Sequence, residues 1–120
     1  MAKKIRVLIA DNNDHVRLLL ACLLQKSHIE IVGEAPNERA IELTRMLKPD
    51  AIVIDIDGDI EAIRVIRKSS PKTKVIGLSM SDAAIPADDR AESGEVVYLS
   101  KNEPWGAMTE SIHRVLAMEG

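Results

Sequence analysis

The sequence predicts a doubly wound α/β domain in which helices cover both faces of a parallel five-stranded sheet. Five short runs rich in apolar residues alternate with longer segments whose apolar residues recur at helical spacing. Several of the short runs are apolar almost throughout, as expected for central parallel strands that are buried on both sides. A chain of 120 residues is long enough for one such domain with a single core.

The five expected strands are separated by segments long enough for right-handed crossover connections. These strands are residues 5–10, 29–34, 51–55, 74–79 and 95–100. In open parallel sheets, ligands bind at the carboxyl ends of the strands. The residues directly after each run are therefore the candidates for a functional site.

Two helices are expected between the first three strands. The first has the spacing of a helix with one buried stripe, formed by Val16, Leu19, Leu20, Leu23 and Leu24. The second begins near Asn37, a residue type that caps helices. It ends at Lys48, because Pro49 disfavours helical backbone in the residue before it.

Three further helices are expected in the second half of the chain. The third begins at Ile60 with Asp59 as its N-cap, and the fifth begins after Pro104, which a first helical turn tolerates. The fourth, within residues 82–93, has Pro86 in its interior, where a proline costs about 3 kcal/mol. We therefore expect the fourth helix to be short, late-starting or poorly ordered.

The composition excludes several classes of function. The net charge of -3 argues against a nucleic-acid-binding face, which is normally basic. The single cysteine, Cys22, cannot form an internal disulfide, which fits a reducing compartment. The first apolar run ends at Asp11, so it is too short for a signal peptide or a membrane span. We therefore expect a cytoplasmic protein with no direct contact to nucleic acid or membrane.

Four of the expected strands end in side chains that suit phosphate chemistry. The first is followed by Asp11 and Asn12, the third ends in Asp55, the fourth ends in Ser79, and the fifth is followed by Lys101. Because the carboxyl ends of parallel strands share one edge, these side chains are expected to converge. Two carboxylates can hold Mg²⁺, and one can attack phosphorus to give an aspartyl phosphate. The lysine and the hydroxyl would then bind the transferred phosphoryl group.

These motifs resemble the receiver domain of bacterial two-component response regulators, over essentially the whole of residues 1–120. The resemblance rests on "IRVLIADNNDHVRLLL", "IEIVGEAPNERAIELTRMLKPDAIVID", "VIGLSM" and "VVYLSKNEP". It implies a flavodoxin-like (βα)5 fold with strand order 2-1-3-4-5. It also implies that Asp55 is the phosphoacceptor, that Ser79 and Lys101 assist it, and that Tyr98 occupies the family's aromatic switch position.

The implied function is that of a phosphorylated switch, not of an enzyme. Asp55 would accept a phosphoryl group from a histidine kinase with Mg²⁺ bound by Asp11, Asn12, Asp55 and Asp57. Ser79 and Tyr98 would then shift, and the face made by the fourth helix, fifth strand and fifth helix would change its protein contacts. The implied output is a second copy of the chain, a C-terminal helix-turn-helix DNA-binding domain, or a separate output protein. We expect no such DNA-binding domain within residues 1–120.

Three departures from the family pattern predict an atypical receiver. Asn12 is neutral where the family usually has a second acid. The segment "DIDGDIEAI", which begins at Asp55, is shorter than in the family, and Arg90 stands where the family usually has a small residue. We therefore expect weak Mg²⁺ binding and slow or absent phosphorylation, with Asp57 as the one nearby acid that could compensate. Neutral drift in a working switch is the alternative.

The segment "VIDIDGD" also resembles motif I of haloacid-dehalogenase-type phosphatases. In that interpretation Asp55 is a nucleophile and Asp57 an acid/base, and the next two motif residues are Ser79 and Lys101. That motif normally follows the first strand of its sheet, whereas Asp55 follows the third expected strand. The acidic motif that should follow the lysine is also missing. The phosphatase is therefore the second hypothesis.

Overall fold

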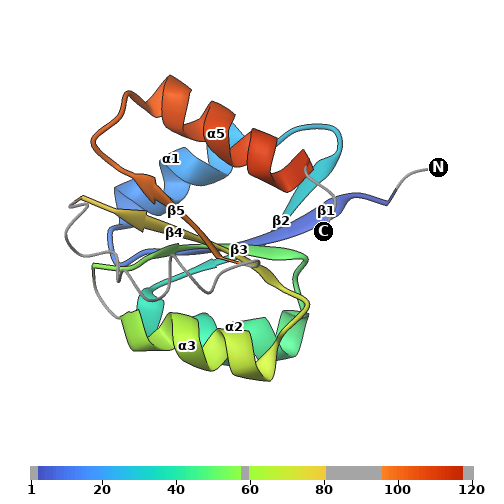
Figure 1. Ribbon diagram of the computed structural model, residues 1–120. Coiled ribbons are helices and arrows are strands. Elements are labelled where there is room, and N and C mark those ends of the chain that lie inside the picture. Colours follow the sequence, from blue (N-terminus) through green and yellow to red (C-terminus); the bar gives the residue numbers. More distant parts are fainter. Residues whose placement is uncertain (1–2, 58–59, 81–95, 118–120) are drawn as a thin grey trace.

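The computed structural model describes residues 3–57, 60–80 and 96–117, and these form one parallel sheet flanked by helices (Figure 1). The sheet contains β1 (Ile5–Ala10), β2 (Ile29–Ala35), β3 (Ala51–Asp55), β4 (Lys74–Ser79) and β5 (Val96–Ser100). Its strand order is β2-β1-β3-β4-β5. The predicted fold class and strand order are thus confirmed, and each strand lies within one residue of its predicted bounds.

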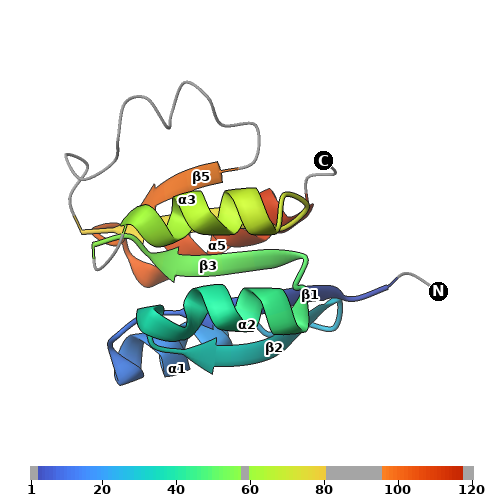
Figure 2. The same cartoon turned by 90° about the horizontal axis from the view of Figure 1, so that it is seen from below.

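Helices cover both faces of the sheet, as predicted. They are α1 (Asp14–Leu24), α2 (Ala40–Leu47), α3 (Ile60–Ser69) and α5 (Trp105–Ala117), and a short 3-10 turn, η1 (Asn37–Arg39), precedes α2. Figure 1 shows α1 and α5 on one face, and Figure 2 views the sheet from the opposite face, where α2 and α3 lie. The expected fourth helix, the N-cap role of Asp59 and the departure at Arg90 fall outside the described residues.

Strand alternation divides the apolar core between the two faces. Successive side chains of a strand point to opposite sides of the sheet. Val7 and Ile9 accordingly pack with buried residues of α1 and α5, whereas Leu8 and Ala10 pack with those of α2 and α3. This two-sided burial explains why the central strands are apolar at nearly every position.

The buried stripe of α1 is narrower than its sequence pattern predicts. Leu20 and Leu24 are fully buried, but Leu19 is 39% exposed and Leu23 is 38% exposed. The two exposed residues lie about 100° around the helix from the buried pair, outside the strip that the sheet and α5 cover. Leu19 and Leu23 therefore belong to the apolar pattern of the helix but not to its buried face.

The end of α2 follows its prediction. The helix ends at Leu47, and Lys48 adopts a left-handed conformation with φ 48° while its N–H donates to the Thr44 carbonyl. Pro49 then blocks further helix. Within the described residues, no helix is both long and apolar enough to cross a lipid bilayer.

Candidate functional site

Three charged side chains meet at the carboxyl edge of the sheet. Asp11 directly follows β1, Asp55 ends β3, and Lys101 follows β5. The Lys101 Nζ lies 2.8 Å from Asp11 Oδ2 and 3.1 Å from Asp55 Oδ1. These side chains are 3% (Asp11), 12% (Asp55) and 11% (Lys101) exposed. The predicted convergence of the two acids and the base is therefore present, in a largely buried cluster.

The ammonium of Lys101 is held between the two carboxylates. Burial by itself lowers the pKa of Lys101, but the hydrogen bonds and charges of Asp11 and Asp55 outweigh it and raise that pKa above the ordinary 10.5. Its ion pairs therefore stabilise the fold fully below pH 10.5 and are lost as the pH rises through the raised value. At neutral pH, two carboxylates and one ammonium leave one net negative charge in the cluster.

Local turns fix the orientation of both carboxylates. Asp11 Oδ1 accepts a hydrogen bond from the N–H of Asn13, whose own side chain caps the start of α1. Asp55 Oδ1 accepts one from the N–H of Asp57 at 3.1 Å, in addition to the contact with Lys101. Among the residues that the structure describes, none donates a hydrogen bond to Asp55 Oδ2. Asp55 Oδ2 is therefore the carboxylate oxygen that the described residues leave available to act as a nucleophile.

Asn37 is a site residue that sequence reasoning misplaced. It was predicted to cap the second helix, but its side-chain Oδ1 accepts no hydrogen bond from the described residues, and α2 begins only at Ala40. Its side-chain Nδ2 instead donates to the Asp55 carbonyl at 2.7 Å, and its backbone N–H donates to Asn12 Oδ1 at 2.9 Å. Asn37 thus links the loop after β1 to the end of β3. A capping signal is local and does not reveal a partner that is distant in sequence.

The Asp57 carboxylate is bound by residues at the end of β4. Asp57 Oδ1 accepts a hydrogen bond from the Ser79 hydroxyl at 2.7 Å, and Asp57 Oδ2 accepts one from the Met80 N–H at 2.9 Å. On a continuing strand Asp57 would point the same way as Asp55, but β3 ends at Asp55, so this alternation does not apply. Both oxygens of the Asp57 carboxylate thus already accept hydrogen bonds, and Ser79 is buried.

The acid cluster offers a divalent cation few charged ligands. Among the described residues there is no group of three or more His, Cys, Asp and Glu side chains placed to hold a metal ion. The exposed Asn12 contributes a neutral oxygen that already accepts the Asn37 N–H. Mg²⁺ nevertheless often binds through one or two carboxylates and completes its shell with water. Asp11 and Asp55 fit such a site by donor chemistry and by their net negative charge.

Asn12→Asp is expected to strengthen Mg²⁺ binding by about tenfold, because affinity for hard cations rises with ligand charge. An aspartate could keep the hydrogen bond from Asn37 with one oxygen and offer the other to the cation. Calorimetric titration with MgCl₂ measures the change. Asn13→Asp is the matched control, since it adds the same charge one residue away at the α1 cap. Equal affinities for Asn12→Asp and the original chain would make the shortened segment after Asp55 the better explanation of weak binding.

Tyr98 lies next to a glycine that makes room for its ring. Tyr98 is half-buried in β5 and pairs with Gly77 of β4. A Cβ atom added to Gly77 would lie 2.7 Å from Ile56 Cγ2 and 2.9 Å from Tyr98 Cδ1. Only a residue without a side chain fits beside this ring. The sequence does not reveal this role of Gly77, because a glycine in a strand gives no sign of what it contacts.

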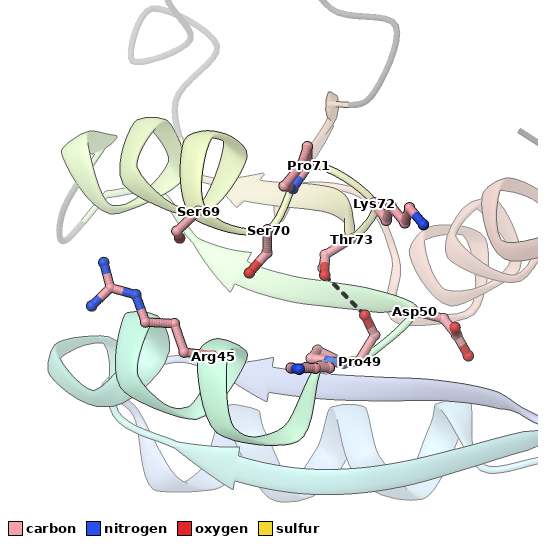
Figure 3. A pocket seen from close by; sticks show the side chains of 9 residues that line it. Arg45, Pro49, Asp50, Ser69, Ser70, Pro71, Lys72 and Thr73 are labelled. Atoms are coloured by element: carbon pink, nitrogen blue, oxygen red, sulfur yellow. Dashed lines mark hydrogen bonds between the residues drawn. The ribbon is translucent and has the colours of Figure 1, made fainter.

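A cavity of about 620 Å³ lies at the other end of the sheet (Figure 3). It is lined by residues that precede β3 and β4, together with the ends of α2 and α3, and includes Arg45, Lys48 and Lys72. The Thr73 hydroxyl donates to the Pro49 carbonyl within it. Cations near the C-terminal end of a helix, as Arg45 is in α2, complement the helix dipole, so their presence has a structural explanation. The cavity and the acid cluster do not coincide.

Comparisons with known proteins found related sequences and a similar solved structure. The family model described as the response regulator receiver domain matches residues 7–113. The chain is 30% identical over 115 residues to the chemotaxis protein CheY of Thermotoga maritima, covering 92% of this chain and 96% of CheY. It is 29% identical over 119 residues to the response regulator GacA of Pseudomonas viridiflava, covering 94% of this chain but 56% of GacA. The solved response regulator domain of Thermotoga maritima CheB superposes with a TM-score of 0.78 at 26% identity, covering 98% of this chain and 100% of that one.

Proposed function

The chain belongs to the family of response regulator receiver domains, and on that premise we propose that it accepts a phosphoryl group on Asp55 from a histidine kinase. The observation that carries this proposal is the contact of Lys101 with both Asp55 and Asp11. Asp55 Oδ1 contacts the Lys101 ammonium, while Asp55 Oδ2 accepts no hydrogen bond from the described residues. This is the arrangement that a carboxylate nucleophile needs.

In the proposed reaction, Asp55 Oδ2 attacks the phosphorus of a phosphohistidine. A new P–O bond forms to the aspartate, and the P–N bond to the histidine breaks. The Lys101 ammonium stays beside the acyl phosphate and offsets the added negative charge. Mg²⁺ held by Asp11 and Asp55 would supply the remaining positive charge toward the phosphoryl oxygens.

We expect this transfer to be slow. The neutral Asn12 lowers the charge available to a cation, and the segment after Asp55 is short. The output of the switch is proposed to pass through Tyr98 and the surface of β5 and α5 to a second copy of the chain, a DNA-binding domain or a separate protein. The chain spans about half the length of GacA, which leaves room in that relative for a further domain. A cytoplasmic location stays a prediction.

Incubation with acetyl phosphate and Mg²⁺, followed by intact mass measurement, tests the proposal. We expect a slow and partial gain of one phosphoryl group that is lost in Asp55→Asn. Asp14→Asn is the control, because Asp14 is an exposed aspartate on α1 whose loss should leave the gain unchanged. A gain retained in Asp55→Asn would identify another acceptor. Rapid and complete phosphorylation would show that the departures at Asn12 and after Asp55 do not limit the reaction.

The phosphatase hypothesis is not supported by the comparisons, which match the receiver family over most of the chain. Its acid/base candidate, Asp57, accepts hydrogen bonds from Ser79 and Met80 and is directed to the end of β4. We therefore propose that the domain does not turn over phosphate esters. Hydrolysis of p-nitrophenyl phosphate that disappears in Asp55→Asn would contradict this.

A further inference from the structure

The carboxylate of Asp57 already fills an anion-binding position beside the phosphorylation site. Its two oxygens accept hydrogen bonds from the Ser79 hydroxyl at 2.7 Å and the Met80 N–H at 2.9 Å. A hydroxyl and a backbone amide from adjacent residues form a small pocket of donors that suits a phosphoryl group as well as a carboxylate. We infer that Asp57 is an internal competitor of the phosphoryl group, and that it must leave these donors before Asp55 can hold one stably. The inference rests on the proposed function of Asp55.

The donors lie at the same edge of the sheet as Asp55. Asp55 pairs with Leu78, the residue before Ser79, and the Ser79 carbonyl accepts the N–H of Lys101 at 2.7 Å. Ser79 therefore lies between the strand that carries Asp55 and the strand that leads to Lys101. A phosphoryl group on Asp55 would find Lys101 on one side and the Ser79–Met80 donors on the other.

Asp57 is tethered so that its carboxylate stays near these donors. It is two residues from Asp55, and its backbone N–H donates to Asp55 Oδ1 at 3.1 Å. Because the tether is short, the carboxylate competes at a high effective concentration, as linked groups generally do. The Asp57 carboxylate occupies the Ser79 and Met80 donors, and its negative charge also repels an incoming phosphoryl dianion.

The apparent affinity of the site for a phosphoryl group equals its intrinsic affinity multiplied by the fraction of molecules in which Asp57 has left the donors. If Asp57 leaves them open in about one molecule in ten or fewer, removal of its carboxylate strengthens anion binding by about tenfold or more. Competition by Asp57 weakens anion binding through Ser79 and Met80. A weak Mg²⁺ site would instead act through Asp11 and Asn12, so the two effects can be separated.

The first experiment measures non-covalent binding of inorganic phosphate in the Asp55→Asn background, where no acyl phosphate can form. The readout is the backbone amide NMR signal of Met80 during a phosphate titration in the presence of Mg²⁺. We expect Asp55→Asn/Asp57→Ala to bind phosphate at least tenfold more tightly than Asp55→Asn alone. Equal affinities would overturn the inference. Asp57→Asn, which removes the charge but keeps one acceptor oxygen, is the second variant if the alanine variant does not fold, and a gain of less than twofold there would also overturn it.

A double-mutant cycle separates occupation of the donors from simple loss of charge. Ser79→Ala, added to Asp55→Asn/Asp57→Ala, should abolish most of the gain in phosphate affinity, because it removes one of the released donors. A gain that persists in full without the Ser79 hydroxyl would assign the effect to charge alone and overturn the inference.

The second experiment repeats the acetyl phosphate reaction with Asp55 intact. Asp57→Ala should take up the phosphoryl group at least severalfold faster than the original chain, and Ser79→Ala should cancel that increase. If neither chain gains a covalent phosphoryl group while Asp57 removal still strengthens phosphate binding, the role of Asp55 as acceptor fails and the competitor role of Asp57 stands. If Asp55 is phosphorylated at the same rate with and without Asp57, the competitor role fails and the proposed function stands.

Discussion

Replacement of Lys101 by methionine is expected to destabilise the domain by about 3–5 kcal/mol, the usual cost of breaking a buried ion pair from one side. The methionine would roughly keep the volume of the side chain but leave two carboxylates, 3% and 12% exposed, without their cation. Urea unfolding at neutral pH, with divalent cations removed by chelation, measures the loss. Lys72→Met serves as the control, because Lys72 is exposed and its replacement should change the free energy of unfolding by less than about 0.5 kcal/mol.

A second substitution identifies the cause of that loss. Asp11→Asn combined with Lys101→Met should recover part of the stability, since it removes one of the two uncompensated charges. The amide oxygen that this change introduces could still accept the hydrogen bond from the N–H of Asn13. A Lys101→Met domain within about 1 kcal/mol of the original would contradict the prediction, because it would show that the carboxylates are hydrated well enough without the ammonium.

Gly77→Ala is expected to lower the free energy of unfolding by about 1–3 kcal/mol, the usual range for overpacking a core. The added methyl group would lie 2.7 Å from Ile56 and 2.9 Å from the Tyr98 ring, so at least one of them must move. Tyr98 is the only tyrosine in the chain, so its ring signals in an NMR spectrum report the displacement directly. The same substitution therefore tests both the packing and the position of the aromatic residue.

Gly106→Ala is the matched control for Gly77→Ala. Gly106 lies in α5, and a Cβ atom there would meet nothing within 4 Å. Alanine favours helix over glycine, so this variant should be more stable by up to about 1 kcal/mol. Opposite changes in the free energy of unfolding for Gly77→Ala and Gly106→Ala would confirm that the space around each glycine decides the effect. Unchanged Tyr98 signals in Gly77→Ala would mean that only the Ile56 side chain moves to make room for the added methyl group.

The sequence predicted the strands and the acid cluster well because both depend on local information. Apolar runs define the strands, and a parallel sheet then brings the residues after β1, β3 and β5 to one edge. The position of Lys101 directly after β5 is enough to predict that it lies near Asp11 and Asp55. The contacts at 2.8 and 3.1 Å agree with that simple rule.

Sequence patterns leave the direction of a side chain undetermined where that direction depends on tertiary contacts. Asp57 lies two residues beyond Asp55, but the strand has ended, and the turn directs its carboxylate to Ser79. Asn37 has the identity of a helix cap, but it bonds Asp55, which is 18 residues away. Leu19 belongs to the helical pattern of α1, but the neighbouring elements do not cover it. Periodicity and residue type do not contain this information.

The reach of Lys101 has a consequence for how the molecule assembles and opens. Its side chain extends from the end of β5, past β4, to Asp55 at the end of β3 and Asp11 after β1, and it joins residues 90 positions apart in sequence. A contact between such distant segments requires a large loop to close, which costs conformational entropy. The charge balance of Asp11 and Asp55 therefore depends on a residue in the last third of the chain. In the reverse direction, separation of β5 from the sheet would withdraw the Lys101 ammonium from both Asp11 and Asp55, so local opening at this edge and the charge of the acid cluster are thermodynamically linked.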